Sequence, residues 1–174
     1  MMVKDQEQAM RIEEKLKEMG LALPPPMQAP QGMRLPFASV RVSGNRAYVS
    51  GHGPVDSTGA LQGLGKVGAD LTVEQGYEAA RQTCLAILGS LRRELGDLDR
   101  ITGWLRVFGM VNAAPGFDQM PRVINGFSDL IIELYGPEVG AHARSAVGLA
   151  ELPIGIPVEI EAEVEITTEA FRPL

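Results

Sequence analysis

Apolar residues recur every three or four positions over residues 74–95, the spacing that places side chains on one face of a helix. The periodic residues are Tyr77, Ala80, Cys84, Ile87, Leu88, Leu91 and Leu95. Thr72 and Gln75 have the spacing of a capping box at its start, and Gly96 is placed to end it. This stretch is therefore predicted to form an amphipathic surface helix.

Two other segments repeat the helical period. Residues 117–136 have Pro121 in the first turn and an inward side made of Val123, Ile124, Phe127, Leu130, Ile131 and Leu134. Residues 6–19 form a shorter amphipathic pattern that stops at Gly20. The sequence ALPPPMQAPQGMRLP follows, and its prolines predict an extended tether rather than a helix or strand.

Strands are predicted where apolar and polar residues alternate. Residues 37–51, FASVRVSGNRAYVSG, hold two β-rich runs around Gly44-Asn45, which is typical of a hairpin. Two more strands are expected at about 144–150 and 158–166, separated by a Leu-Pro turn. The glycine-rich loop between the hairpin and the first long helix is expected to hold at most one short strand.

Residues 101–111 differ because both alternating sets are apolar. One set is Ile101, Leu105, Val107 and Val111, and the other is Trp104, Phe108 and Met110. A strand of this kind is covered on both faces. The predicted order of elements is that of an α+β domain with both main helices on one face of a mixed sheet. Only the short N-terminal helix is left to cover the face of the sheet opposite the two main helices. We therefore expect that face to pack against another subunit in a symmetric oligomer.

Composition narrows the class of protein. The length of 174 residues suits one domain, which we divide into an N-terminal helix and tether (1–34) and an α+β body (35–174). The net charge of −6 provides no positive field for phosphate backbones, so nucleic acid is not an expected partner. No apolar stretch approaches 18 residues and the N-terminus is too acidic for a signal peptide, so we expect a cytoplasmic protein with no membrane partner.

The common catalytic residue sets are missing from the sequence. Cys84 lies in a helical apolar stripe, which favours a small buried residue over a nucleophile. No His, Cys and Asp spacing predicts a metal site, and the glycines of GALQGLGKVG fit no phosphate-binding loop. The remaining candidates for a functional site are Arg144 and Glu159, the latter on the last predicted strand. The planar guanidinium of an arginine can bind a carboxylate through two hydrogen bonds. From the residues alone, a solvated glutamate face and a structural salt bridge at Arg144 stay open.

Three motifs carry a resemblance to a known family. The segments YVSGHGPVD, ARSAVGLAELP and PVEIEAEVEI, in this order over residues 35–166, resemble the reactive intermediate deaminase (RidA) family, formerly called YjgF or L-PSP endoribonucleases. The resemblance implies a chorismate mutase-like α+β fold. It also implies a homotrimer in which the sheets form a central barrel, with three clefts between the subunits.

The resemblance also implies roles for particular residues. Arg144 corresponds to the arginine that binds the substrate carboxylate, and Glu159 to the glutamate that positions the hydrolytic water. Ser50 and Gly51 correspond to the cleft wall, and Asn125 to an asparagine on the second long helix. The substrates implied are small carboxylate-bearing enamines and imines, which are hydrolysed to 2-oxo acids and ammonia without a cofactor or a metal.

The chain departs from the family pattern at several positions. Phe37 stands where many members have a tyrosine, and Ala146 where a cysteine is common. His52 replaces a glutamine, and His142 lies two residues before Arg144; either could be a proton donor in the cleft or a plain surface histidine. Two alternatives to the deaminase therefore remain, a non-catalytic trimer that binds a small carboxylate or a partner, and the endoribonuclease of the older family name.

Overall fold

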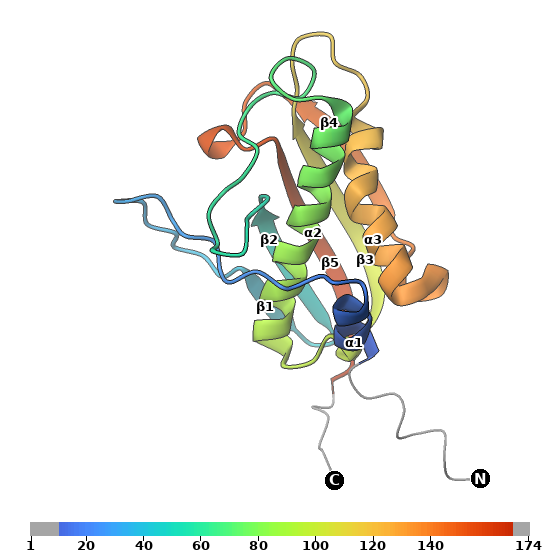
Figure 1. The fold of residues 1–174 in the computed structure, drawn as a ribbon. Helices are drawn as coiled ribbons and strands as arrows, with labels where there is room; N and C mark the ends of the chain where they lie inside the picture. The colour runs from blue at the N-terminus through green and yellow to red at the C-terminus, as the bar shows by residue number, and fades with distance from the viewer. Residues whose placement is uncertain (1–10, 169–174) are drawn as a thin grey trace, which may run out of the picture.

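The computed structural model describes residues 11–168, and over this range the elements follow the predicted order (Figure 1). Residues 6–10 of the expected first helix lie outside the described range. Two short 3-10 turns, at Leu98–Arg100 and Pro153–Gly155, join some of the main elements. The helices and strands are α1 (Arg11–Glu18), β1 (Val40–Ser43), β2 (Arg46–His52), α2 (Val73–Leu95), β3 (Ile101–Asn112), α3 (Met120–Gly140), β4 (Ala143–Leu149) and β5 (Val158–Ile166).

The ends of the long helices confirm the local signals in the sequence. Thr72 caps α2 in a complete capping box: its hydroxyl accepts from the Gln75 amide at 3.2 Å, and the Gln75 side chain accepts from the Thr72 amide at 2.9 Å. Gly96 ends α2 in the left-handed region, with φ of 80°. Pro121 lies in the first turn of α3, which is interrupted at Gly136 (φ 77°) and closes at Gly140.

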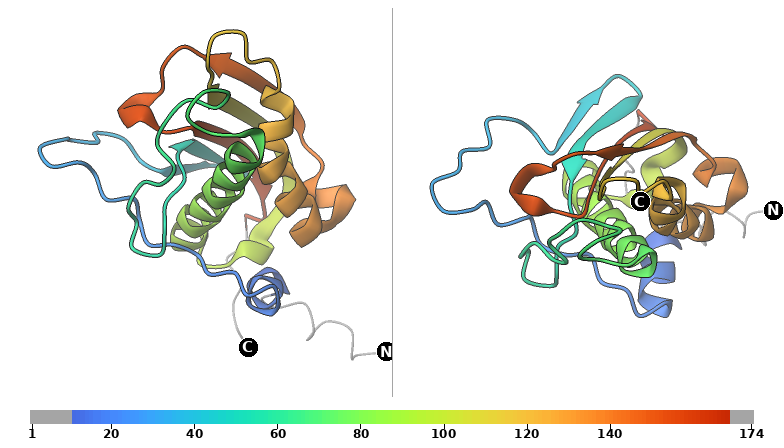
Figure 2. Two further views of the ribbon diagram at one scale, coloured as in Figure 1. Left: turned by 45° about the horizontal axis from the view of Figure 1, so that its top comes forward. Right: turned by 90° about the horizontal axis from the view of Figure 1, so that it is seen from above.

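The five strands form one mixed sheet in the order β1-β2-β5-β3-β4. All neighbours are antiparallel except β3 and β4, which are parallel and joined by α3. Both long helices lie on the same face of the sheet (Figures 1 and 2). The prediction of an α+β fold with two helices on one face of a mixed sheet is confirmed. None of the described helices combines the length and apolarity needed to cross a bilayer.

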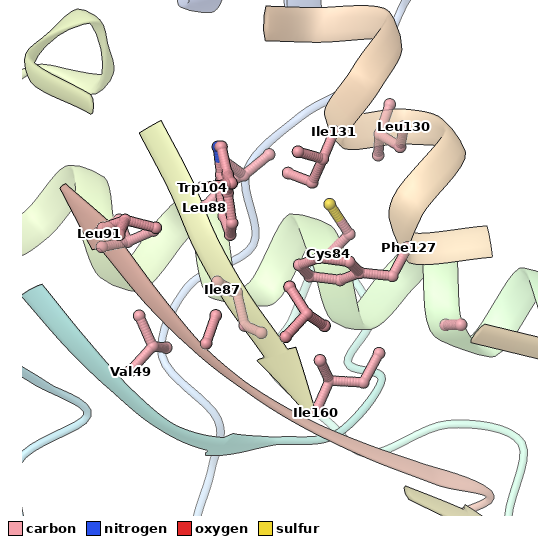
Figure 3. Packing of buried hydrophobic residues seen from close by; sticks show 14 of the residues in the cluster. Val49, Cys84, Ile87, Leu88, Leu91, Trp104, Phe127, Leu130, Ile131 and Ile160 are labelled. Atoms are coloured by element: carbon pink, nitrogen blue, oxygen red, sulfur yellow. The ribbon is translucent and has the colours of Figure 1, made fainter. Parts of the chain in front are cut away.

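The core lies between the sheet and the two helices (Figure 3). Trp104 packs edge-on against Phe127 at 5.7 Å and against Tyr135 at 5.8 Å between ring centroids. Cys84 is fully buried there, and burial raises the pKa of its thiol. The sequence interpretation of Cys84 as a small core residue is confirmed.

One prediction about β3 was wrong. Trp104 was assigned to the same face of the strand as Phe108 and Met110, but it is buried in the core with Val107 and Val111. The pairing of β3 with β5 shifts register between Trp104 and Arg106, and the extra residue turns Trp104 to the helix face. Phe108 and Met110 remain on the open face, which no described helix of the chain covers. The glycine-rich loop of residues 53–72 makes only isolated bridges, within the expectation of at most one short strand.

The N-terminal segment belongs to the same core. Ile12 and Leu16 of α1 are buried in the central cluster, and the Lys15 ammonium donates to the Leu134 carbonyl at 2.8 Å. From Gly20 to Ser39 the chain forms no helix or strand, as its prolines predicted. It crosses the lower part of α2 (Figure 1), where Arg93 donates to the Pro24 carbonyl at 3.1 Å.

Candidate functional site

Arg144 lies on the edge strand β4, and its side chain is directed toward α3. It pairs in register with the buried Val107, so both residues are on the helix-covered face of the sheet. Its Nη1 atom donates to Asn125 Oδ1 at 2.9 Å and to Ser128 Oγ at 3.0 Å. The other terminal nitrogen donates to the Pro121 carbonyl at 3.4 Å. Three neutral acceptors from the start of α3 therefore fix the guanidinium.

The charge of Arg144 has no direct carboxylate partner within residues 11–168. Asp129 is the nearby acid, and its attraction opposes the larger effect of burial, which lowers the pKa of Arg144. The structural salt bridge that the sequence left open is not formed among these residues. Asn125 also borders a groove of about 290 Å³ between α2 and α3. A positioned, half-buried guanidinium of this kind is suited to binding an external carboxylate.

Glu159 lies on β5, on the opposite face of the sheet. It pairs with Met110 of the open face, and its carboxylate rests against the backbone of Gly51 on β2. A Cβ at Gly51 would lie 2.0 Å from Glu159 Oε1, so only glycine leaves room for the carboxylate. Burial, and secondarily the charge of Glu161, raises the pKa of Glu159. A carboxylate with a raised pKa in a half-buried place is a candidate general base.

Two of the other glutamates of the strand, Glu161 and Glu165, have ordinary surface partners. Glu161 lies 3.8 Å from Arg106, and Glu165 accepts from Thr102 at 3.2 Å. Both pairs are solvent-exposed and contribute little to stability. Glu159 differs from them because burial raises its pKa, and within the described chain it takes part in no ion pair.

Arg144 and Glu159 do not meet within the chain. Val107 and Met110 mark their positions on β3, three residues apart, with β4 on one side and β5 on the other. Strand spacing and rise then separate the two Cα atoms by roughly 14 Å, with the side chains on opposite faces. The candidate residues form two half-sites, Arg144 with Asn125 and Glu159 with Gly51.

The two histidines are not plain surface residues, so that interpretation was wrong. His52 bonds the Ser50 carbonyl through Nδ1 at 2.6 Å and the Ser90 hydroxyl through Nε2 at 2.8 Å. His142 bonds the Gly140 carbonyl at 2.7 Å and the Ser128 hydroxyl at 2.9 Å in the same manner. Because all four ring nitrogens are engaged inside the protein, neither ring presents an uncommitted proton to a ligand.

The two remaining predicted residues lie at the start of the sheet. Ser50 donates its hydroxyl to the Ala38 carbonyl at 2.7 Å, which ties β2 to the segment before β1. Phe37 lies in that segment and is 58% exposed, outside the buried cluster. Ser50 is therefore held close to Gly51 by the chain, whereas Phe37 belongs to neither half-site within one protomer.

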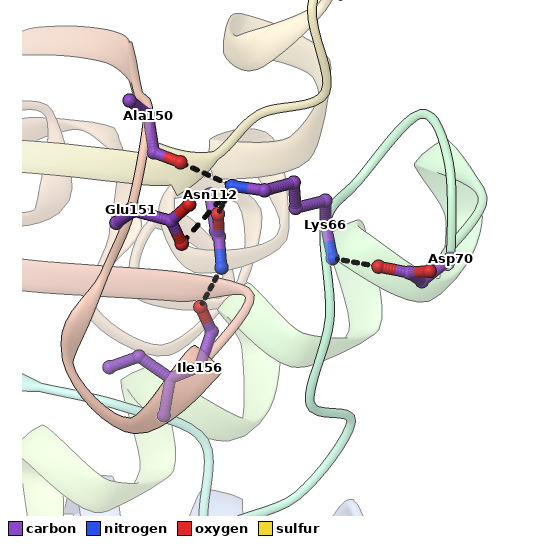
Figure 4. A network of polar contacts seen from close by, with 6 residues as sticks. All are labelled: Lys66, Asp70, Asn112, Ala150, Glu151 and Ile156. Atoms are coloured by element: carbon purple, nitrogen blue, oxygen red, sulfur yellow. Dashed lines mark hydrogen bonds and ion pairs between the residues drawn. The ribbon is translucent and has the colours of Figure 1, made fainter.

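Lys66 ties the glycine-rich loop to the rest of the domain (Figure 4). The Lys66 ammonium donates to Asn112 Oδ1 at 2.8 Å and to the Ala150 carbonyl, and it lies 3.3 Å from the Glu151 carboxylate. Asn112 in turn donates to the Ile156 carbonyl at 3.2 Å. These contacts join the loop to the ends of β3, β4 and β5, so the interpretation of its glycines as loop residues is confirmed. Within residues 11–168 no cluster of three His, Cys, Asp or Glu side chains could hold a metal ion.

The five-stranded mixed sheet with α2 and α3 on one face defines a chorismate mutase-like α+β fold. The chain belongs to the YjgF family: residues 13–156 match the family model described as "YjgF/chorismate_mutase-like, putative endoribonuclease". The resemblance inferred from the three sequence motifs is thereby confirmed.

Individual relatives agree with this assignment. The chain is 39% identical to Protein TCP17 of Trypanosoma cruzi over 156 residues, which cover 90% of this chain and 94% of that protein. The crystal structure of Atu1372 from Agrobacterium tumefaciens is 38% identical, covers 92% of this chain and 95% of its own, and superimposes with a TM-score of 0.80. A Shewanella oneidensis structure titled "putative endoribonuclease" is 30% identical, with a TM-score of 0.80 and coverage of 89% and 99%.

Sequence reasoning missed Ser128 and Ser90, which contact Arg144 and His52, and it missed Arg93, which donates to Ser90. A signal for Ser128 was present, because Asn125 and Ser128 are three residues apart on an otherwise apolar helix face. Ser90 and Arg93 show the same spacing on α2. Their partners come from other elements of the chain, and a periodicity within one helix does not identify those partners.

Proposed function

We propose that the protein hydrolyses small carboxylate-bearing enamines and imines to 2-oxo acids and ammonia, at sites shared between the protomers of a homotrimer. One observation carries this proposal: Arg144 is held by neutral acceptors and takes part in no ion pair among the described residues, so its charge is available to a ligand. Family membership and the raised pKa of Glu159 support it.

The chemistry needs a binding group and a base. Arg144 binds the substrate carboxylate through its guanidinium fork and fixes the reacting carbon at a set distance. An enamine first takes a proton on carbon to become the iminium ion. Glu159 then removes a proton from water as the oxygen adds to the iminium carbon, and it returns that proton to nitrogen. The carbinolamine, protonated on nitrogen, expels ammonia while its hydroxyl proton passes to water, and the carbon–oxygen double bond of the 2-oxo acid forms.

A shared site follows from the positions of the two half-sites. A small imine cannot span the roughly 14 Å and the two sheet faces that separate Arg144 from Glu159 in one chain. The open face also carries Phe108 and Met110, apolar side chains that a neighbouring protomer would cover. Both facts support a homotrimer in which Arg144 of one protomer faces Glu159 of the next, and a native mass measurement tests the assembly.

Hydrolysis of freshly generated imine tests the activity. An amino-acid oxidase supplies 2-iminobutyrate or iminopropionate, and 2-oxo acid formation is followed above the uncatalysed rate. Glu159→Gln is expected to lower kcat about 100-fold or more, because the base is lost, while KM changes little.

In the wild type kcat should rise with pH through the raised pKa of Glu159, above the ordinary value of 4.5, and Glu159→Gln should remove this rise. If imine hydrolysis with the wild-type protein were no faster than the uncatalysed reaction, the proposed deaminase activity would be rejected.

Coexpression of two inactive chains tests the shared site. When equal amounts of Arg144→Ala and Glu159→Gln chains assemble at random, one shared site in each mixed trimer combines an intact arginine with an intact glutamate, which is about a quarter of all sites. Activity should therefore return in the mixed trimers and stay low when the two purified homotrimers are combined without subunit exchange. No recovery in verified mixed trimers would mean that both residues act within one chain.

Assays of 2-oxo acid binding and of RNA cleavage separate the deaminase from its two alternatives. Saturable binding of 2-oxo acids without turnover would identify a non-catalytic carboxylate-binding trimer. RNA cleavage by highly purified protein that disappears in Arg144→Ala would support the endoribonuclease. The net charge of −6 makes RNA the less favoured substrate, since phosphate backbones are bound mainly through positive charge.

A further inference from the structure

Both histidines of the chain sit in the same arrangement of hydrogen bonds. In each ring, Nδ1 bonds the carbonyl of the residue two positions earlier, and Nε2 bonds a serine hydroxyl on a long helix. In each case that serine oxygen also accepts from an arginine. The chain thus contains two series of hydrogen bonds that join an arginine, a serine and a histidine, and we call each series a relay. One relay is built on α2 and the other on α3.

The α3 relay ends at the carboxylate-binding half-site. Ser128 Oγ accepts from Arg144 Nη1 at 3.0 Å and contacts His142 Nε2 at 2.9 Å. His142 packs edge-on against Phe127, with 6.0 Å between the ring centroids, which limits the movement of its ring. The guanidinium of Arg144 is therefore oriented by a hydroxyl that is itself oriented by His142.

The α2 relay ends at the other half-site. Ser90 Oγ accepts from Arg93 at 2.9 Å and contacts His52 Nε2 at 2.8 Å. His52 bonds the Ser50 carbonyl inside the irregular part of β2, where the register with β5 shifts between Val49 and His52. That irregular part contains Gly51, which packs against the Glu159 carboxylate. His52 thereby holds the backbone against which Glu159 rests.

The partners define the protonation of both rings. A carbonyl oxygen only accepts, so Nδ1 must carry a proton in each ring. Burial lowers the pKa of both His52 and His142, and the neighbouring Arg93 and Arg144 lower it further, while the bond to the carbonyl acts in the opposite direction. Each ring is then neutral at pH 7, Nε2 accepts the serine proton, and the serine lone pairs face the arginine.

We infer that His142 and His52 are positioning residues, one for each half of the site. His142 sets the orientation of Arg144 through Ser128, and His52 fixes the Gly51 segment against Glu159. Neither histidine touches the substrate. The roles of these residues in turnover rest on the proposed function, whereas the relays themselves do not.

The protonation of the rings is tested first, in the unmodified protein. Nitrogen-15 NMR of the two imidazoles at pH 7 should show a protonated Nδ1 and an unprotonated Nε2 in both rings. A ring that carries its proton on Nε2, or a doubly protonated ring, would overturn the relay to which it belongs.

Leucine variants should then separate the two roles in the kinetics. His142→Leu is expected to raise KM roughly tenfold with kcat nearly unchanged, because the carboxylate anchor serves substrate and transition state alike. His52→Leu is expected to lower kcat roughly tenfold with KM nearly unchanged, because it displaces the base. Glutamine at either position offers an oxygen to the serine and should restore most of the lost parameter. A general structural defect would instead change both parameters in both variants and would reject the inference.

Binding of 2-oxobutyrate, measured by calorimetry, separates this inference from the proposed function. His142→Leu should weaken binding roughly tenfold, and His52→Leu should leave it within about twofold of the wild type. A wild-type protein without turnover would reject the deaminase, while the ring protonation and this pair of affinities would still decide the relays. Equal affinities in the two variants would overturn the assignment of His142 to Arg144.

Discussion

Arg144→Ala is expected to lower kcat/KM for imine hydrolysis by about two to four orders of magnitude, the largest effect on activity that the site predicts. Charge-assisted hydrogen bonds contribute about 1.5–3 kcal/mol each, and a bound carboxylate loses two of them. Arg144→Lys retains the charge without the planar fork and should recover only part of the rate. The measurement is steady-state hydrolysis of 2-iminobutyrate, with circular dichroism to verify folding.

A control removes an arginine elsewhere. Arg11 is exposed on α1 and contributes no side chain to either half-site, so Arg11→Ala should leave kcat/KM unchanged. The comparison separates loss of the anchor from loss of one positive charge. An Arg144→Ala protein that is folded and as active as Arg11→Ala would show that the guanidinium is not the anchor.

Gly126→Ala is expected to cause the largest loss of stability, about 3 kcal/mol or more in the free energy of unfolding. A Cβ at Gly126 would lie 2.0 Å from the Tyr77 carbonyl oxygen and 2.8 Å from its carbon, so α2 and α3 would have to separate. The usual gain of about 1 kcal/mol when alanine replaces glycine in a helix is smaller than this cost. For a domain of this size, Tm should fall by roughly 6–12 °C in a thermal melt.

Gly76→Ala provides the matched control. Gly76 is likewise a helix glycine, in α2 rather than α3, but a Cβ there would meet the Val123 methyl groups at 3.1 Å rather than a backbone atom. Side chains adjust more readily than a helix backbone, and this variant should stay within about 1 kcal/mol of the wild type. If Gly126→Ala were as stable as Gly76→Ala, the close crossing of α2 and α3 at Tyr77 would be wrong.

Local sequence signals predicted the elements of the fold well. The capping box of Thr72 and Gln75, the terminal Gly96 and the strand at 158–166 all have the predicted positions. Each depends on hydrogen bonds or side-chain periods within a few residues of the chain, and such interactions are recognisable in a linear sequence. The residues alone singled out Arg144 and Glu159, and the family motifs added their roles in catalysis, which are predictions that the experiments above test.

Features that depend on contacts between residues far apart in the chain could be determined only from the tertiary structure. A register shift with β5 moved Trp104 into the core, although its strand period predicted the opposite face. The contacts of His142 with Ser128 join two elements that the sequence does not relate.

The sequence by itself therefore determined the helices, the strands, the buried Cys84 and the family of this protein, because local periods and caps are properties of neighbouring residues. Only the folded chain decided that Arg144 and Glu159 lie on opposite faces of the sheet and that a neutral histidine supports each half-site. Strand pairing and contacts between helix and sheet set those positions, and both depend on how segments far apart in the chain pack together.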